Sequence, residues 1–235
     1  MIEINQNMQC SIFHVGNEKT PILVIDDFVE NIESVRSVAA AQPFTSPRDG
    51  LHYPGLHSSI GAEYGNAILR AIKPLFQRDP FNVSPYLSLY PMDGVYSLLT
   101  STVENLTPAQ SKPHFDTPMP NCYAVLHYLN QGDFGGTAFY RHNPSNFECI
   151  SAERLDTYIK AEEQFISQQD KTESKYFTDS NAHFNLTHLV KYKQNRLVIY
   201  PTSVFHSIYV DDINKNVNSD PQTGRLTANF FLCFK

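Results

Sequence analysis

The stretch RLVIYPTSVFHSIYV (residues 196–210) decides the fold class. It contains two short apolar runs, 196–200 and 204–210, with a turn signal at Pro201 between them. Short runs rich in Val, Ile and Tyr that are separated by such a turn are typical of successive β-strands. The stretch therefore predicts two strands, and it places His206 in the middle of the second, otherwise apolar run.

Similar runs occur on both sides of this stretch. Each is short, apolar or alternating, and bounded by turn signals: PYLSLY (85–90), YSLLTSTV (96–103), CYAVLHYLN (122–130), GTAFYRH (136–142) and RLTANFFLCF (225–234). The 16 Phe and 13 Tyr also favour strands over helices. We expect a mainly β fold with flanking helices, built as a sandwich or barrel.

The N-terminal region, residues 1–83, mixes both kinds of pattern. The apolar run PILVIDDFV (21–29) predicts a strand, and apolar residues at helical spacing from Ile32 onward predict a helix after it. Segment 43–61 is dense in Pro, Gly and Ser, so we expect an irregular loop there. These elements are expected to pack on the β core.

The interval 143–190 interrupts the succession of strands. It is polar, and its apolar residues between Leu155 and Ile166 fall on one helical face. We expect a helical insertion within a jelly-roll core at 84–235. No shift in composition marks a domain boundary, so residues 1–235 are expected to form a single domain.

The charge balance argues against a nucleic-acid partner. The chain has 18 Lys and Arg against 24 Asp and Glu, a net charge of −6, and the basic residues are not clustered. The first residues lack a basic start followed by an apolar run, and no segment approaches the roughly 18 apolar residues of a membrane span. We expect a cytoplasmic protein without a membrane segment, whose oligomeric state cannot be predicted.

The four cysteines, Cys10, Cys122, Cys149 and Cys233, are widely spaced and include no CxxC pair. Neither a zinc knuckle nor a compact disulfide framework is indicated. We expect four free thiols, buried or partly buried.

The segment KPHFDTP (112–118) contains the first candidate metal ligands. His114 and Asp116 are two positions apart, so on a strand both side chains face the same way. An imidazole, a carboxylate and a second histidine from a neighbouring strand would complete a 2-His-1-carboxylate facial triad. Among the later histidines His206 fits best, although a histidine in an apolar run is otherwise a hydrogen-bonded core residue.

The order of several motifs is similar to one enzyme family. PHFD, HYLN, FGGTAFY, NRLVIYP, FHS and GR follow one another through residues 113–225 as in the Fe(II)- and 2-oxoglutarate-dependent oxygenases of the prolyl 4-hydroxylase-like branch. The resemblance covers about residues 90–235. It implies a double-stranded β-helix, a cupin-like jelly roll of two antiparallel sheets. It also implies Fe(II), 2-oxoglutarate and O2, and hydroxylation of a substrate with release of succinate and CO2.

The resemblance assigns roles to single residues. His114 and Asp116 match the HxD motif of the family, and His206 matches its distal histidine ligand. Arg225 matches the basic residue that pairs with the far carboxylate of 2-oxoglutarate, a role suited to a planar guanidinium. Asp116 stands where halogenating relatives have a small residue, which favours hydroxylation.

Two further residues are candidates for cosubstrate binding. Tyr128 matches a tyrosine that in some relatives donates its hydroxyl to the same carboxylate, and Thr227 lies on the strand face of Arg225. The spacing from His206 to Arg225 is longer than is usual in the family, so we expect segment 211–224 to form a long hairpin loop.

The remaining histidines near these motifs have simpler explanations. His127 is next to Tyr128, so alternation sends it to the opposite face. Arg141 and His142 are expected at the rim of a sheet.

Substrate binding in this fold is expected from loops and insertions. We expect 143–190 to cover the mouth of the site and 43–61 to line it, although His52 and His57 there are most simply exposed loop residues. Neither segment identifies the substrate, which could be a small molecule or a peptide.

Two other functions are compatible with the sequence. A cupin-like metalloenzyme would use the same barrel and metal without an oxoacid, and Arg225 and Tyr128 would then be structural. A non-catalytic binding module on the same barrel would need none of the metal ligands.

Overall fold

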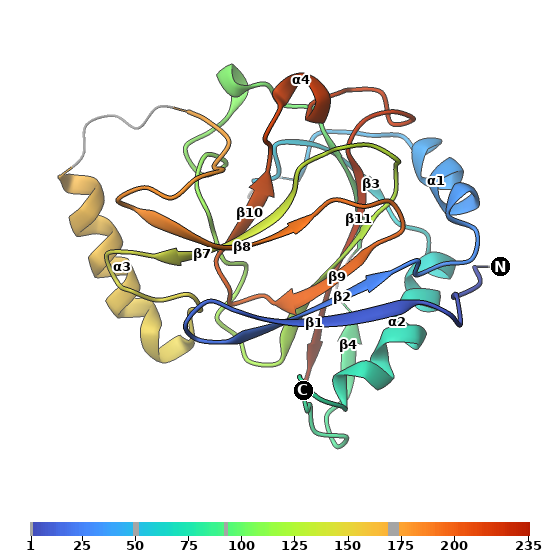
Figure 1. Cartoon of the computed structure of the whole chain (residues 1–235), viewed down its shortest axis with the longest axis horizontal. Coiled ribbons are helices and arrows are strands. Elements are labelled where there is room, and N and C mark those ends of the chain that lie inside the picture. Colours follow the sequence, from blue (N-terminus) through green and yellow to red (C-terminus); the bar gives the residue numbers. More distant parts are fainter. Residues whose placement is uncertain (1, 49–51, 92–93, 169–173) are drawn as a thin grey trace.

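The computed structural model describes residues 2–48, 52–91, 94–168 and 174–235. Two antiparallel sheets form its centre (Figure 1). The large sheet has the order β1 (Gln9–Val15), β2 (Thr20–Asp26), β9 (Leu197–Pro201), β6 (Cys122–Tyr128), β11 (Leu226–Phe234), β5 (Val95–Leu99) and β3 (Gly55–Ser59), with β4 (Leu89–Pro91) paired to β11. The small sheet has the order β10 (His206–Tyr209), β7 (Gly136–His142) and β8 (Phe184–Lys191).

The chain alternates between these sheets as it winds from β5 to β11. After β6 in the large sheet it forms β7 and β8 in the small one, returns to the large sheet with β9, and repeats the exchange with β10 and β11. An isolated bridge between His114 and His206 attaches the segment before β6 to the β10 edge of the small sheet. This winding is a double-stranded β-helix, so the predicted fold class is confirmed.

Two helices cover the outer face of the large sheet (Figure 1). The predicted strand and helix near the N-terminus are present as β2 and α1 (Ile32–Ala40), and α2 (Ala62–Phe76) follows. Ile68 of α2 packs in one buried cluster with Leu226 and Ala228 of β11. Burying such apolar faces stabilises the fold by roughly 25 cal/mol per Å² of apolar surface.

The expectation of an irregular loop over 43–61 is wrong in part. Its last residues form β3, which pairs with β5 along its whole length. The strand GLHSS contains no β-branched residue, and backbone pairing with β5 on one side and with Thr45 on the other holds it extended. Residues 49–51 lie outside the described residues.

The predicted insertion at 143–190 contains one helix, α3 (Ala152–Ser167), and part of a core strand. Tyr158 of α3 packs against Phe205, in a cluster on the outer face of the small sheet. Residues 184–190 were assigned to the insertion, but they form most of β8, whose extended backbone is fixed by pairing with β7. Residues 169–173 lie outside the described part, so the extent of the insertion and the domain limits remain predictions.

The segment between β10 and β11 is a folded connection. It contains the short helix α4 (Ile213–Asn216) where a hairpin loop was expected. The Asn130 amide, at the end of β6, donates to the carbonyls of Pro221 at 3.0 Å and Gly224 at 2.7 Å. These bonds hold the chain immediately before Arg225 against the barrel. One turn of 3-10 helix, η1 (Val103–Asn105), precedes the His114 segment.

The expectation of four free thiols is wrong, because Cys122 and Cys233 form a disulfide. They face each other directly on the antiparallel strands β6 and β11. Their separation of 111 residues hid this pairing from the sequence. Cys10 and Cys149 are free.

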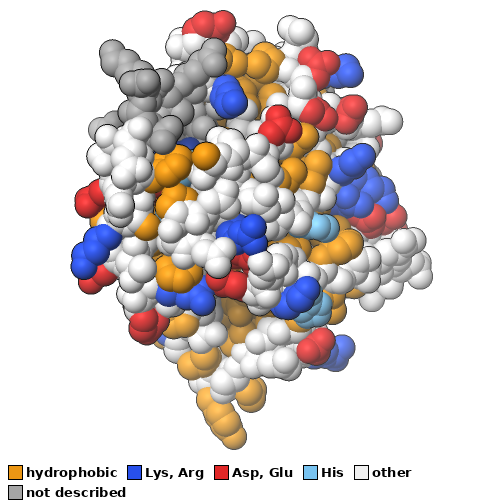
Figure 2. Space-filling model, turned by 60° about the vertical axis from the view of Figure 1, so that its left-hand side comes forward, with side chains coloured by type: hydrophobic (Ala, Val, Ile, Leu, Met, Phe, Trp, Pro, Cys, Tyr) orange, Lys and Arg blue, Asp and Glu red, His pale blue; other side chains and the backbone are white. Residues whose placement is uncertain are grey.

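On the surface near α3, basic and acidic side chains are interspersed, with apolar patches between them (Figure 2). Among the described residues, no helix is both long and apolar enough to cross a membrane.

Candidate metal centre and oxoacid pocket

Backbone pairing brings the HxD segment next to the predicted distal histidine. The His114 amide donates to the His206 carbonyl at 3.0 Å, and the His206 amide donates back at 2.8 Å. Two residues further on, the Asp116 amide donates to the Thr202 carbonyl at 2.8 Å. This short antiparallel pairing places all three candidate ligands at one edge of the small sheet.

The three side chains converge. One ligand atom from each of His114, Asp116 and His206 lies within 4.8 Å of the others. Nε2 of His114 is 3.8 Å from Asp116 Oδ1, and Nε2 of His206 is 3.9 Å from Asp116 Oδ2. These separations are too long for hydrogen bonds, and they leave room for an ion that binds each ligand at about 2.1 Å. The structure therefore brings together the three residues that the sequence predicted, in an arrangement that could hold a divalent metal.

The tautomer of His206 suits a metal ligand. Its Nδ1 lies 3.0 Å from the Val204 carbonyl, which can only accept, so Nδ1 carries the proton. Nε2 then presents its lone pair to the centre of the group. A histidine ligand oriented by a hydrogen bond from its other nitrogen is the usual arrangement at metal sites.

Electrostatics favour neutral imidazoles here. Burial, together with His206, lowers the pKa of His114 to about 4 against the opposing effect of Asp116, and burial lowers the pKa of His206 to about 4. Burial also raises the pKa of Asp116 to about 6, opposed by His114. The side chain of His114 is nevertheless 54% exposed and that of Asp116 21%, so solvent can reach this group. The three side chains have lone pairs available and form no hydrogen bonds with one another.

Arg225 lies inside the barrel, just before β11. It is 1% exposed, and its guanidinium carbon is 5.7 Å from the ring centres of both Tyr128 and Tyr192. Nη2 donates to the Gly136 carbonyl at 3.2 Å, while the buried Nε has no hydrogen-bond partner. Among the described residues, no carboxylate forms an ion pair with Arg225. A buried guanidinium with an unused donor is suited to an anionic ligand.

Two buried hydroxyls without partners occur near Arg225 in the structure or the sequence. The Thr227 hydroxyl is buried and has no hydrogen-bond partner, and the same is true of Tyr53. Burial raises the pKa of Tyr53 to about 12, although the nearby Arg225 opposes the rise. The hydroxyl of Tyr128 already pairs with Thr137 at 2.7 Å. The unused hydroxyls of Tyr53, near Arg225, and of Thr227, two residues after it, could together with the unused Nε bind a carboxylate.

Tyr53 was not among the predicted site residues. It lies in the Pro- and Gly-rich segment before β3, where no spacing pattern distinguishes it. Only the fold reveals that this segment returns to the barrel.

A row of polar side chains crosses the inner face of the large sheet. Strand register places His57 of β3 opposite Ser97 of β5, Ser97 opposite Thr227 of β11, and Thr227 opposite Tyr128 of β6. His57 is half-buried in this row, so the expectation of an exposed loop histidine is wrong for it. His52 is exposed, as expected, and lies near enough to His114 to affect its pKa.

Of two expectations for the other histidines, one is confirmed and the other is wrong. His127 faces away from the barrel interior, as expected, and its ring nitrogens pair with Tyr64 and Asn195. His142 was expected at a sheet rim, but it is fully buried beneath α3. It belongs to a second group that sequence reasoning missed.

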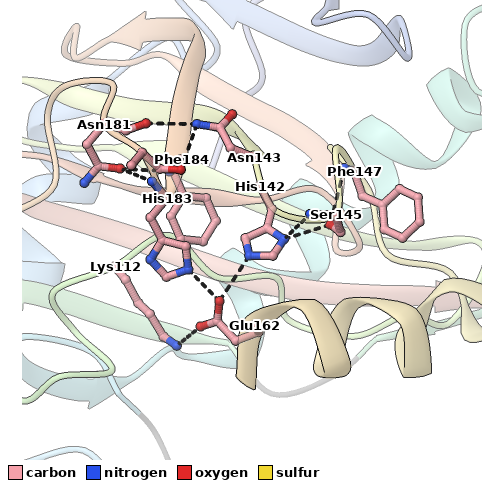
Figure 3. Close-up of polar contacts among 10 residues, drawn as sticks. Lys112, His142, Asn143, Ser145, Phe147, Glu162, Asn181, His183 and Phe184 are labelled. Atoms are coloured by element: carbon pink, nitrogen blue, oxygen red, sulfur yellow. Dashed lines mark hydrogen bonds and ion pairs between the residues drawn. The ribbon is translucent and has the colours of Figure 1, made fainter. Parts of the chain in front are cut away.

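This second group contains His142, Glu162 and His183 (Figure 3). By residue type and proximity it too could hold a metal ion. Glu162 Oε2 is 3.1 Å from Nε2 of His142 and 2.5 Å from Nε2 of His183, while Oε1 is 2.6 Å from the Lys112 ammonium. All three distances are hydrogen-bond distances.

The hydrogen-bonding groups of this second group already have partners in the protein. The Glu162 carboxylate can only accept, so Nε2 of His142 carries a proton and donates to Oε2, while Nδ1 of His142 lies 2.7 Å from the Ser145 hydroxyl. Burial alone would raise the pKa of Glu162, but hydrogen bonds from His142, His183 and Lys112 hold that pKa well below its ordinary value. A carboxylate that receives an ammonium and two imidazole donors is a stable hydrogen-bonded network, not an open ligand set.

Sequence comparison places the whole fold in one family. Residues 6–232 match the family of unknown function DUF6445. The chain belongs to this family. No curated protein matches the sequence.

Solved structures give distant similarities. HygX from Streptomyces hygroscopicus, with nickel, 2-oxoglutarate and hygromycin B bound, is 12% identical over 91% of this chain and 83% of its own, with a TM-score of 0.47. An N-substituted L-amino acid dioxygenase from Burkholderia ambifaria is 10% identical over 93% and 83%, with a TM-score of 0.40. Because both scores are low, we base the function of this DUF6445 member on the geometry of its own site.

Proposed function

We propose that this protein is an Fe(II)- and 2-oxoglutarate-dependent oxygenase that hydroxylates a small-molecule or peptide substrate. The observation that carries the proposal is the pairing of two features in one barrel. One is the open His114, Asp116 and His206 group, and the other is the buried Arg225, whose Nε has no partner. A metal site alone would not require the second feature.

The residues fit both groups. His114, Asp116 and His206 would hold the iron and leave positions free for other ligands. Arg225, with the hydroxyls of Tyr53 and Thr227, would hold the far carboxylate of the oxoacid. When bound, iron and 2-oxoglutarate supply the oxidation, in which O2 adds one oxygen atom to a substrate C–H bond and the other to the oxoacid, giving succinate and CO2.

The protein's own contribution is binding and orientation. The Val204 carbonyl keeps the proton of His206 on Nδ1, so that Nε2 stays free for the metal. Aromatic rings of Tyr128 and Tyr192 exclude water from the Arg225 guanidinium, which strengthens its attraction for an anion. The exposed side of His114 leaves the group open to substrate.

The test is an anaerobic titration with Fe(II) and then 2-oxoglutarate, followed by the visible absorption band of the iron-bound oxoacid. We expect the band in the wild type, and a requirement for about tenfold more 2-oxoglutarate, or more, in Arg225→Ala. Arg154→Ala is the matched control, because Arg154 pairs with Glu18 at 2.8 Å outside the barrel. It should titrate like the wild type.

The alternatives predict other results. Bound iron without a band would indicate the cupin-like metalloenzyme that uses no oxoacid. Absence of iron binding would contradict the proposed metal centre itself.

A further inference from the structure

Helix α3 contacts the metal-ligand segment at two points. Tyr158 and Glu162 are four positions apart, so they lie on the same face of the helix. The Tyr158 ring meets Phe115 edge-on at 5.7 Å, and Glu162 Oε1 accepts from Lys112 at 2.6 Å. Phe115 lies between the two candidate ligands of the HxD motif, and Lys112 lies two residues before the first of them.

Glu162 also reaches the strands on the other side of the site. Figure 3 shows one oxygen of its carboxylate between His142 and His183, while the Lys112 ammonium meets the other oxygen. His142 is the last residue of β7, and His183 precedes the first residue of β8. β7 in turn pairs with β10, where Phe139 lies directly opposite His206.

One carboxylate thus connects both chain segments that carry the candidate ligands. On one side Lys112 leads to His114 and Asp116, and on the other His142 leads through β7 to His206. The histidine side of the network is buried, since the side chain of Glu162 is 10% exposed and that of His142 is fully buried, while the side chain of Lys112 is 35% exposed. Buried hydrogen-bonded networks of this kind fix geometry more strictly than surface pairs do.

We propose that Glu162 is a positioning residue for the metal centre. Through Lys112 it holds the HxD segment at the separation from β10 that the three ligands need. This inference rests on the proposed function, because it assumes that His114, Asp116 and His206 bind a metal. In this role α3 supports the metal centre from the outer face of the small sheet. The sequence had predicted that the segment containing α3 covers the mouth of the site.

The experiment compares Co(II) binding by visible absorption, and thermal stability, in the wild type and three variants: Glu162→Gln, Lys112→Met and the double variant. Loss of a residue that orients metal ligands weakens metal binding about ten- to hundredfold, and we expect each single variant to show this. The double variant should bind Co(II) as well as the single variant with the lower affinity, because both substitutions remove the same contact between Glu162 and Lys112.

Two controls separate positioning from general destabilisation. Glu163→Gln makes the same chemical change on the exposed side of α3 and should leave Co(II) affinity unchanged. Leu155→Ala removes a packing contact of α3 with the small sheet without touching Lys112. It should lower the melting temperature but keep Co(II) affinity within about twofold of the wild type.

The outcomes are distinct. Wild-type affinity in both Glu162→Gln and Lys112→Met would overturn the inference and leave the proposed function intact. An equal loss of affinity in Leu155→Ala would overturn it as well, since destabilisation alone would then explain the effect. If Glu162→Gln fails to fold, Lys112→Met decides. A wild type that binds no Co(II) would overturn both the inference and the proposed function.

Discussion

Among the described residues, two groups consist of two histidines and one carboxylate, and the hydrogen bonds of these two groups differ. In His206, Nδ1 donates to a carbonyl and leaves Nε2 free, whereas in His142, Nε2 donates to the Glu162 carboxylate, which can only accept. The carboxylate of Asp116 is 3.8–3.9 Å from its imidazoles, while Glu162 is in hydrogen-bond contact with its own. Residue type alone therefore does not identify a metal site. What matters is whether the protein has already satisfied the lone pairs.

The largest predicted difference between the two groups is in Fe(II) affinity. His206→Ala should weaken Fe(II) binding more than about a hundredfold, because it removes a ligand outright. His183→Ala should still bind one Fe(II) per chain. Anaerobic titration with iron analysis of the washed protein measures both. Two equivalents in the wild type, or loss of iron in His183→Ala alone, would reverse the roles of the two groups.

The two carboxylates should also differ in their contribution to stability, and here the larger effect is expected at Glu162. Glu162→Ala is expected to lower the free energy of unfolding by about 2 kcal/mol, because it leaves the fully buried Nε2–H of His142 without an acceptor. Asp116→Ala in the metal-free protein should change it by no more than about 0.5 kcal/mol, since the Asp116 side chain is 21% exposed and makes no hydrogen bond with the described residues. Urea unfolding of both variants provides the values. A large loss in Asp116→Ala would show that this carboxylate has a structural partner.

A smaller, pH-dependent difference should follow from Glu162. Because the pKa of Glu162 is lowered by folding, its contribution to stability is complete above its ordinary pKa of 4.5 and decreases as the pH falls below that value. The stability difference between the wild type and Glu162→Gln should therefore be constant near neutral pH and shrink in acid. Unfolding curves measured from pH 7 to pH 3 would test this, and a difference that grows in acid would contradict it.

The part of the site that sequence analysis found has a local pattern. His114 and Asp116 are two residues apart on an extended segment, and His206 stands in a strand whose apolar run is easily recognised. The order of the strands then brings the three together. Arg225 came from the family resemblance alone, which matches it to a basic residue at the start of the last strand.

The part that sequence analysis missed has no such pattern. Lys112, His142, Glu162 and His183 come from a loop, a strand, a helix and a second loop, and only packing of α3 on the small sheet unites them. The Cys122–Cys233 disulfide was hidden for the same reason, since strand register across 111 residues creates it. β3 was missed because GLHSS has weak strand propensity and depends on β5 for its conformation.

The most direct test of the central claim is a crystal structure of the protein with Fe(II) and 2-oxoglutarate under anaerobic conditions, with anomalous diffraction recorded at the iron absorption edge. We predict a single anomalous peak between His114, Asp116 and His206, with the far carboxylate of 2-oxoglutarate on Arg225. A peak between His142, Glu162 and His183, or no peak at the first group in iron-loaded crystals, would contradict the account.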